Sequence, residues 1–500
     1  MRVEEAGKYL RLYGEAGEHI VASRFLGWRQ EKGKHYVTVE NNVVNNILLG
    51  RDVAPKEYAP LHVDEGVLKE YQVRDVQKMV KVGNILNRNP MGLGKTVEAI
   101  MTMRELDIDS GLIVLPKIVG PQWRSQVVRW WPERAQDVVL YDNNNVKVQK
   151  GDIVIINYEK LLNETTLNKL RMFQWDIVVA DEAHRIKSPK SQRTLALKAI
   201  PSQLRVALTG TPILNKPDDL WSILHFLDWR YSGISYWNFV NYFCEVQEGF
   251  WGRKIVGLTK APSRIAVLNT LLERVSVYNP LEVAQGKTRE VVKLEMTPKQ
   301  RKLYKDMKNL VLDELPENAS IANGAVLTIR LIQATSWPGL FIEGEYGPKF
   351  EWILNTCKDN PEEKFVIFTR FEKTASGLRE YLIKNGVRSV QLTGAVDDRQ
   401  REINKNTFIK DKGCQLLIGT IAAMGQGTDG LQEVSHVCIF IDRDWSPEIM
   451  NQCEDRLNRF GQKYPVQSYV LECEKSFDQY VGKINQHKAS DIREALGNDD

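Results

Sequence analysis

The chain has 500 residues, enough for about three domains of ~150 residues each, and its 43% hydrophobic and 26% charged residues are ordinary for a globular protein. No run of about 18 apolar residues occurs and the first residues are acidic, so we expect no membrane span, no secretory signal and a cytoplasmic location. A net charge of +4 neither requires nor excludes nucleic acid, and six scattered cysteines without close pairs indicate free thiols rather than a zinc site.

Residues 1–68 are predicted to form a small, β-rich accessory module. Segments 19–26 and 35–40 have the composition of strands, and Lys32-Gly33-Lys34 is typical of a turn between them. We find no chemical signature in this module. Two interpretations are open: an accessory nucleic-acid-binding domain, or an appendage that packs on the next domain.

From residue 69 the pattern changes to alternating strands and helices. Short runs of consecutive apolar residues are typical of strands buried on both faces, and hence of a parallel sheet covered by helices. These runs fall into an early and a late series: 111–116, 152–157, 176–180 and 205–208, then 365–368, 415–418 and 436–441. We therefore predict an α/β fold with two parallel-sheet lobes, residues 69–232 and 345–500, joined by helical insertions and a linker at 233–344.

The region around the predicted insertions contains an aromatic-rich stretch and a basic helix. Residues 221–251 carry many aromatic side chains at helical spacing with few basic residues between them, which favours core packing over a base-stacking platform. Residues 297–312 begin with a Thr-Pro helix start and are strongly basic. Such a helix either faces phosphate or presents an ordinary solvated face.

A glycine-containing run, Asn89-Pro90-Met91-Gly92-Leu93-Gly94-Lys95-Thr96, precedes a segment that is predicted to begin a helix. Glycines at such a junction let backbone N–H groups approach phosphate, and the helix N-terminus adds a favourable dipole. Lys95 would reach the β- and γ-phosphates and Thr96 would hold Mg²⁺. Asn89 stands where the P-loop pattern has its first glycine, so an ordinary turn before a helix is the alternative.

Two acids, Asp181 and Glu182, follow the apolar strand 176–180. An acid at the C-terminal end of a parallel strand is placed to bind Mg²⁺ opposite a P-loop. We expect Asp181 to hold the metal and Glu182 to orient or deprotonate the attacking water; a common pair of loop acids is the alternative. The run 209–212, Thr-Gly-Thr-Pro, either links this site to movement elsewhere or is only a turn.

Two arginines, Arg456 and Arg459, stand near the end of the second lobe. If the segment is helical, they lie three residues apart on one face. The second lobe has no P-loop of its own, so we expect them to serve the first lobe as arginine fingers, each worth ~10³–10⁵ in rate. The alternative is a surface helix with salt bridges to Glu454 and Asp455.

In this order the motifs resemble those of the Swi/Snf-type DNA translocases, helicase-like ATPases of superfamily two. The first lobe supplies 74–77, 91–96, 114–116 with Gln122-Trp123, 157–159, Asp181-Glu182-Ala183-His184, and 208–212 with Asn215. The second lobe supplies 366–369, the glycine-rich 422–427, 444–447 and 452–462. The pattern Asp455-Arg456-x-x-Arg459-x-Gly461-Gln462 resembles the Swi/Snf ending more than that of RNA helicases with Asp-Glu-Ala-His.

The chain departs from this family in two places. The family usually has two acids where Asn89-Pro90 stand, and the glycine-rich 422–427 lacks the usual Ala-Gly-Gly. The latter segment, with 245–275, looks closer to the branch that contains annealing helicases and fork remodellers. The chain resembles a prokaryotic or phage member of that branch.

The resemblance implies two RecA-like lobes that use ATP and Mg²⁺, with Gln77 on adenine and Thr96 and Asp181 on the metal. The residues that it implies to bind nucleotide are Gln77, Met91, Gly92, Leu93, Gly94, Lys95, Thr96 and Gln452. Those that it implies to be catalytic are Lys95, Asp181, Glu182, Arg456 and Arg459.

The resemblance also implies a nucleic-acid partner. We expect a monomer that binds duplex or branched DNA without sequence specificity and that remodels forks or migrates branches. Residues 185–190 are a candidate DNA edge, with a solvated loop as the alternative. An RNA helicase and a DNA-binding module with a weak ATPase are the alternative functions.

Overall fold

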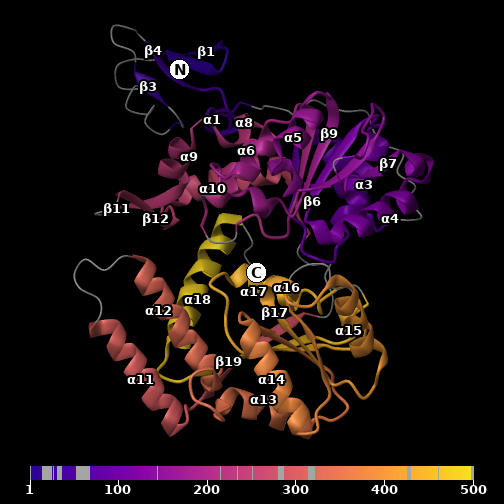
Figure 1. Cartoon of the computed structure of the whole chain (residues 1–500). Helices are drawn as coiled ribbons and strands as arrows, with labels where there is room; N and C mark the ends of the chain where they lie inside the picture. Colours follow the sequence, from indigo (N-terminus) through magenta and orange to yellow (C-terminus); the bar gives the residue numbers. More distant parts are fainter. Residues whose placement is uncertain are drawn as a thin grey trace. The chain divides into compact units, whose positions relative to one another are not determined.

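The computed structural model divides the chain into two compact units (Figure 1). Unit 1 comprises residues 1–90, 94–281 and 490–500, and unit 2 comprises residues 91–93 and 282–489. The structure describes residues 2–13, 25, 28–30, 36–51, 68–143, 145–213, 216–233, 235–249, 252–279, 286–313, 321–424, 430–459 and 461–496. Most of the predicted strand 19–26, the turn 32–34, Asn215 and residues 425–427 lie outside these ranges.

The N-terminal module is a four-stranded antiparallel sheet in the order β1-β2-β4-β3. Its strands are β1 (Arg2–Ala6), β2 (Tyr9–Tyr13), β3 (Arg29–Gln30) and β4 (Tyr36–Glu40), so the strand predicted at 35–40 is confirmed. Helix α1 (Val43–Leu48) follows, capped by the Asn42 side chain, and buries Val43 and Val44 in the main core of unit 1. The packing-appendage interpretation therefore describes how this module is attached.

Unit 1 is built on a seven-stranded sheet in which every pairing is parallel. In sheet order the strands are β13 (Ser276–Val277), β5 (Ile85–Asn87), β10 (Ser202–Leu208), β9 (Trp175–Asp181), β6 (Gly111–Leu115), β8 (Ile153–Asn157) and β7 (Val138–Leu140). Successive side chains alternate between the two faces, so Leu112 and Val114 enter one core and Ile113 the other. The four apolar runs predicted as buried strands are all confirmed.

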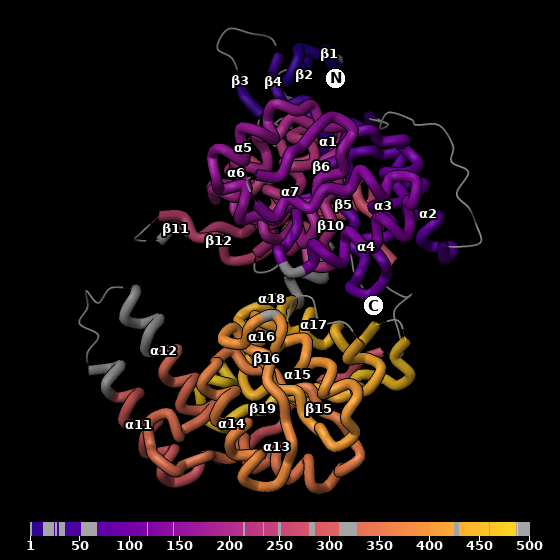
Figure 2. The backbone as a smooth tube through the Cα atoms, turned by 45° about the vertical axis from the view of Figure 1, so that its right-hand side comes forward, coloured from indigo at the N-terminus to yellow at the C-terminus, as the bar shows by residue number. Residues whose placement is uncertain are grey.

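Helices cover both faces of this sheet (Figure 2). One core contains side chains from α2 (Glu70–Val82), α3 (Lys95–Glu105) and α4 (Gly120–Trp130). The other contains side chains from α5 (Glu164–Arg171), α6 (Gln192–Lys198) and α7 (Asp219–Leu227).

The aromatic stretch is part of the second of these cores. It forms α7, α8 (Trp229–Ser232) and α9 (Tyr236–Phe243), followed by the hairpin β11 (Cys244–Gly249) and β12 (Gly252–Leu258) and by α10 (Pro262–Val275). The buried aromatic residues are Trp221, Phe226, Tyr231, Phe239, Tyr242 and Phe243. Core packing of these helices is thus confirmed for the described residues; Phe250 and Trp251 lie outside them.

Unit 2 has a second all-parallel sheet, of six strands. Its order is β14 (Lys287–Leu294), β19 (Val466–Cys473), β18 (Val437–Phe440), β15 (Phe365–Thr369), β17 (Leu416–Thr420) and β16 (Ser389–Leu392). Helices α13 (Gly347–Asp359) and α14 (Glu372–Lys384) pack on one face. Helices α15 (Asp398–Lys410), α16 (Ile421–Met424) and α17 (Pro447–Glu454) pack on the other. The predicted fold class, two parallel-sheet α/β lobes with a small β-rich module, is confirmed.

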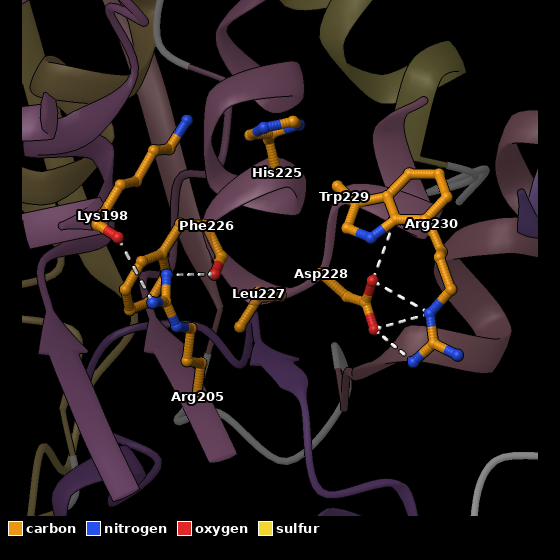
Figure 3. Close-up of a pocket in the computed structure, with 8 residues that line it drawn as sticks. All are labelled: Lys198, Arg205, His225, Phe226, Leu227, Asp228, Trp229 and Arg230. Carbon is orange, nitrogen blue, oxygen red and sulfur yellow. Dashed lines mark hydrogen bonds and ion pairs between the residues drawn. The ribbon is translucent and has the colours of Figure 1, made fainter. Parts of the chain in front are cut away.

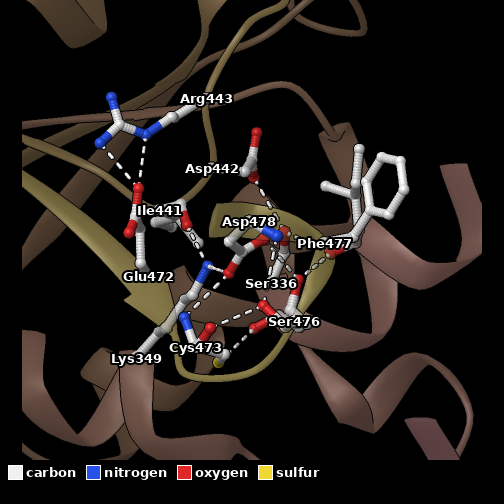
Figure 4. Close-up of polar contacts among 12 residues, drawn as sticks. Ser336, Lys349, Ile441, Asp442, Arg443, Glu472, Cys473, Ser476, Phe477 and Asp478 are labelled. Carbon is white, nitrogen blue, oxygen red and sulfur yellow. Dashed lines mark hydrogen bonds and ion pairs between the residues drawn. The ribbon is translucent and has the colours of Figure 1, made fainter. Parts of the chain in front are cut away.

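A buried ion pair links α13 to two further helices (Figure 4). Lys349 of α13 donates to Asp478 Oδ2 at 2.8 Å and to the Ile441 carbonyl at 2.6 Å, and its side chain is almost fully buried. Asp478 lies in α18 (Phe477–Leu496), and its Oδ1 accepts from Thr335 of α12 (Ile321–Ser336). The basic segment predicted at 297–312 is helix α11 (Pro298–Asp313), which precedes α12.

Two general expectations can be checked on the described residues. None of their helices combines the length and the apolar character that crossing a membrane requires. The six cysteines are all buried and unpaired, which confirms the prediction of free thiols.

Candidate nucleotide-binding site

The predicted site lies at the carboxyl edge of the unit 1 sheet. Strand β10 lies between β5 and β9, and Leu208 is in register with both Asn87 and Asp181. Because neighbouring strands are ~4.8 Å apart, the ends of β5 and β9 are separated by roughly 10 Å. The fold therefore brings the glycine-containing loop after β5 and the acids after β9 to one edge.

The glycine-containing loop joins β5 directly to α3, as predicted. Gly92 and Gly94 have φ angles of 84° and 86°, a left-handed conformation that glycine adopts without strain. Helix α3 begins at Lys95, whose Nζ donates to the carbonyls of Asn89 at 2.7 Å and Pro90 at 3.0 Å. The N-terminus of α3 therefore presents both its free backbone N–H groups and the Lys95 ammonium, and such a site suits an anionic ligand.

Asn89, the departure from the P-loop pattern, is fully buried. Its Nδ2 donates to Asp75 Oδ2 at 2.6 Å and to Glu98 Oε2 at 3.1 Å. Burial raises the pKa of Glu98 to about 8 and also raises the pKa of Asp75. The Asn89 side chain thus belongs to an interior polar cluster beneath the loop rather than to the loop's ligand side.

The carboxylate of Asp181 is held by an indole. Trp123 Nε1 donates to Asp181 Oδ2 at 2.7 Å, and the backbone N–H of Glu182 donates to Oδ1 at 2.9 Å. Tyr158 donates its hydroxyl to the Asp181 carbonyl at 2.7 Å. Burial and the Glu182 charge raise the pKa of Asp181 to about 6, against which the Trp123 bond and the Lys95 charge act. In the sequence Trp123 and Tyr158 are only parts of motifs, whereas in the structure both donate hydrogen bonds to Asp181.

Glu182 has an unusual backbone and a defined partner. Its φ of 50° is left-handed, a strained conformation for a residue with a side chain, and such strain is concentrated at functional sites. Its Oε2 lies 3.4 Å from His184 Nδ1, and the same nitrogen lies 3.4 Å from Thr209 Oγ1. Thr209 N donates to the Asn87 carbonyl, so the segment after β10 connects the acids to the end of β5. This connection favours the linking interpretation of 209–212.

Helix α2 carries two glutamines, and the structure distinguishes them. Gln77, the predicted adenine-contacting residue, is exposed. Gln72, one turn closer to the start of α2, lies against the loop, because a Cβ on Gly94 would be only 2.5 Å from Gln72 Nε2. The sequence offered a signal for Gln72: the first turn of a helix that leads to the loop is a position from which a side chain can reach the loop.

The residues predicted to hold Mg²⁺ have suitable chemistry. Mg²⁺ prefers oxygen ligands and is usually bound through one or two protein groups together with phosphate oxygens and water. Thr96, in the first turn of α3, and Asp181 supply a hydroxyl and a carboxylate at the same edge of the sheet. No group of three His, Cys, Asp or Glu side chains in the described ranges could hold a metal by itself. The residues therefore fit a metal that arrives with a nucleotide.

The predicted site residues of unit 2 lie around the end of α17. Gln452 is in this helix, but the helix ends at Glu454, so the condition under which Arg456 and Arg459 would share a helical face is not met. Arg459 Nε donates to the Asp455 carbonyl at 3.0 Å.

The acids beside these arginines have cationic partners on β14. Arg289 contacts Glu454 at 2.7 Å, and Lys287 contacts Asp455 at 2.8 Å. These ion pairs join the end of α17 to β14 and are tertiary contacts rather than contacts within one helix.

The candidate DNA edge at 185–190 is partly neutralised. Arg185 contacts Glu159 at 3.3 Å and Lys187 contacts Asp219 at 3.7 Å, although the segment itself contains no acid. The basic residues of α11 up to Lys308 are exposed, which agrees with a solvated face. Neither segment has a geometry that assigns DNA contact.

A cavity of about 630 Å³ lies elsewhere in unit 1 (Figure 3). Its lining residues are Lys198, Arg205, His225, Phe226, Leu227, Asp228, Trp229 and Arg230. Arg205 donates to the carbonyls of Phe226 at 3.0 Å and Ile200 at 2.9 Å. Phe226 lies in the last turn of α7, and Ile200 follows the end of α6. This guanidinium therefore caps two helix C-termini, where a cation is stabilised. The cavity is a structural feature separate from the predicted site.

Comparisons with known proteins match two families. The SNF2-related domain family matches residues 35–333, and the helicase conserved C-terminal domain family matches residues 348–461. The probable ATP-dependent DNA helicase CHR12 of Arabidopsis thaliana is 28% identical over 467 residues, which are 84% of this chain and 41% of that protein. The ATP-dependent DNA helicase DDM1 of the same plant is 26% identical over 481 residues, 85% of this chain and 61% of that protein.

This chain spans about two fifths of the length of most of these curated relatives. Among solved structures, the Sulfolobus solfataricus SWI2/SNF2 ATPase core in complex with dsDNA is 23% identical with a TM-score of 0.40. That comparison covers 87% of this chain and 94% of the other.

Proposed function

The chain belongs to the SNF2-related family, and from that premise we propose that it is a DNA-dependent ATPase that couples ATP hydrolysis to movement along duplex DNA. The observation that carries the proposal is the edge of the unit 1 sheet, where Lys95 and the pair Asp181 and Glu182 follow strands on either side of β10. Relatives named as ATP-dependent DNA helicases support the choice of substrate.

Two of the groups that bind Lys95 are neutral and could be replaced by ATP. They are the backbone carbonyls of Asn89 and Pro90, to which its ammonium donates. Hydrogen bonds between two charged groups are stronger than those to a neutral carbonyl, so phosphate oxygens compete well for this ammonium. Gln72, which lies against Gly94, takes the adenine-contacting role in place of Gln77 in this proposal.

Asp181 and Glu182 have different roles in the proposed reaction. Thr96 and Asp181 would hold Mg²⁺, which when bound would supply positive charge to the phosphates. Trp123 and Tyr158 keep Asp181 at the end of β9. Glu182, held near His184, orients the attacking water and accepts its proton.

We further propose that branched DNA is the preferred substrate, in a prokaryotic or phage setting and with fork remodelling or branch migration as the activity. The support is the resemblance of 245–275 and 422–427 to the fork-remodelling branch. An RNA helicase is disfavoured by the ending from Asp455 to Gln462. The other alternative, a DNA-binding module with a weak ATPase, is suggested by the departure from the family pattern at Asn89-Pro90.

One assay separates these functions. ATP hydrolysis is measured without nucleic acid and with duplex DNA, forked DNA, single-stranded DNA or RNA, for the wild type and for Lys95→Ala. We expect turnover that DNA stimulates, forked DNA most strongly, and that Lys95→Ala abolishes. Stimulation by RNA alone would refute the proposal, and absence of turnover with every nucleic acid would favour the weak-ATPase alternative. Equal stimulation by duplex and forked DNA would refute only the branched-DNA preference.

A further inference from the structure

Asn89 joins four segments of unit 1 through its side chain and backbone. The amide donates to Asp75 of α2 and to Glu98 of α3, and Asn89 N donates to Asn87 Oδ1 at 3.1 Å. Asn279, beyond β13, donates from its backbone N at 2.9 Å and from its Nδ2 at 3.1 Å to Asn89 Oδ1. Both oxygen and nitrogen of one fully buried amide are therefore used.

The neighbours favour an amide at this position. Asp75 and Glu98 both accept from Asn89 Nδ2, and Asp75 also accepts from Asn279 Nδ2 and Glu98 from Asn87 Nδ2, so the Asn89 amide is one of three that surround the two acids. A carboxylate at position 89 would accept but not donate, and it would add a third acid to a buried cluster that has two. Burying an unpaired charge is costly, so the residue type is set by the interior and not by the ligand.

The same residue supplies the carbonyl that holds Lys95. The Asn89 carbonyl accepts from Lys95 Nζ at 2.7 Å, the shorter of the two bonds which that ammonium makes to the loop. Fixing the side chain fixes this carbonyl, because both belong to one residue whose N–H is also bonded. The cluster thereby sets where the loop begins and where the ammonium lies.

The segment after α10 is attached to the loop at three successive residues. Val277 pairs with Asn87 in the sheet, and the Arg88 backbone N donates to the Val277 carbonyl at 3.1 Å. Arg88 Nε also donates to Ser276 Oγ at 3.0 Å. Asn279 completes the series on Asn89, and only two residues later the chain passes into unit 2.

We propose that Asn89 is a positioning residue that sets the phosphate loop for Lys95 and fastens it, through Asn279, to the segment from which the chain leaves unit 1. The inference rests on the proposed ATPase function. It makes two separable predictions, one for nucleotide affinity and one for coupling to DNA.

The affinity prediction is tested with Asn89→Asp, with the double variant Asn89→Asp/Glu98→Gln, and with Asn42→Asp. The double variant returns the buried acids to two and restores a donor beside position 89. Asn42 is the matched control: it is also buried and donates to a carboxylate, Glu40, but it lies beside α1, away from the loop. ADP affinity is measured by calorimetry, thermal stability by melting, and KM and kcat for ATP with saturating duplex DNA.

We expect Asn89→Asp to weaken ADP binding and raise KM by roughly 10-fold or more, with a smaller change in kcat, because one buried donor is lost and one acid gained. The double variant should recover most of the affinity and of the melting temperature. Asn42→Asp should lower the melting temperature alone. Wild-type ADP affinity in Asn89→Asp, or no recovery in the double variant, would overturn the inference.

The coupling prediction is tested with Asn279→Ala. This variant should keep ADP affinity within about threefold of the wild type but lose most of the stimulation of turnover by DNA, since the Asn89 amide keeps its own bonds to Asp75 and Glu98. Full DNA stimulation in this variant would overturn the coupling. If Asn89→Asp does not fold, the double variant Asn89→Asp/Glu98→Gln still tests the role of the added charge. Recovery of folding in the double variant supports that role, and failure to recover overturns it. A wild type that binds no ADP would instead overturn the proposed function.

Discussion

The indole of Trp123 gives a sharp test of how the metal site is built. Trp123 is buried, and its single N–H donates to Asp181 Oδ2 at 2.7 Å. Trp123→Phe keeps an aromatic ring in the core but removes this donor. The carboxylate that is proposed to hold Mg²⁺ then loses the bond that orients it.

The expected magnitude follows from partners of metal ligands in general. Removing a group that orients a metal ligand costs roughly 10- to 100-fold in metal affinity. We therefore expect the Mg²⁺ concentration for half-maximal ATP hydrolysis to rise by at least about 10-fold in Trp123→Phe. Tyr158→Phe should have a smaller effect, because Tyr158 donates to the Asp181 backbone carbonyl and not to the carboxylate.

Trp175→Phe is the matched control. Trp175 is also fully buried in unit 1, and its indole donates to a backbone carbonyl, that of Leu170, at 3.0 Å. Both tryptophan variants should lose about 0.5–3 kcal/mol of stability, measured by denaturant unfolding. Only Trp123→Phe should change the Mg²⁺ dependence. An unchanged Mg²⁺ dependence in Trp123→Phe, or an equal rise in Trp175→Phe, would refute the reasoning.

Three further predictions concern the nucleotide, acid stability and unit 2. Gln72→Ala should raise KM for ATP and weaken the preference for ATP over GTP, whereas Gln77→Ala should do neither; the reverse result would restore Gln77 as the adenine contact. Burial and nearby positive charge lower the pKa of His225 to about 4, below its unfolded value near ~6.5, so its neutral form contributes stability that is lost as pH falls from about 6.5 to 4. His225→Phe should therefore flatten the decline of melting temperature over that window, and an unchanged decline would contradict the burial argument. Lys349→Met leaves Asp478 unpaired and should destabilise unit 2 by about 3–5 kcal/mol, with part of the loss recovered by adding Asp478→Leu, both measured by denaturant unfolding.

The central strands could be predicted from the sequence because both of their faces are buried. A run such as 111–115 is apolar throughout, and few other structures require that. Edge strands carry no such signal. Strand β14 begins with four polar residues and is mostly exposed, so the sequence alone assigns its residues to a linker, and β13 has only two residues. What identifies these strands is the neighbour with which each one pairs.

The site residues likewise include some that could be predicted from the sequence and some that could not. Asp181 is predicted at the end of a strand because it follows an apolar run, and Lys95 is predicted at the start of a helix because it follows the glycines of the loop; the structure has both residues at those places. For the adenine contact the sequence analysis names Gln77, whereas the structure has Gln72 against the loop; five residues along a helix turn a side chain by roughly 140°, so the two glutamines face different sides. The pairing of Glu454 and Asp455 with β14 could not be predicted, because Arg289 and Lys287 are far away in the sequence.

Asn89 shows why a departure from a motif need not mean lost function. A P-loop acts through backbone N–H groups, a lysine and a hydroxyl, none of which is the side chain at its first position. In this chain that side chain turns into the interior, where Asp75 and Glu98 require a donor. Asn89 in place of the usual residue therefore changes the hydrogen bonds beneath the loop, while Lys95 keeps its place at the start of α3. The weak-ATPase alternative loses the observation that motivated it, and nucleotide turnover abolished by Lys95→Ala becomes the expected behaviour of an intact loop.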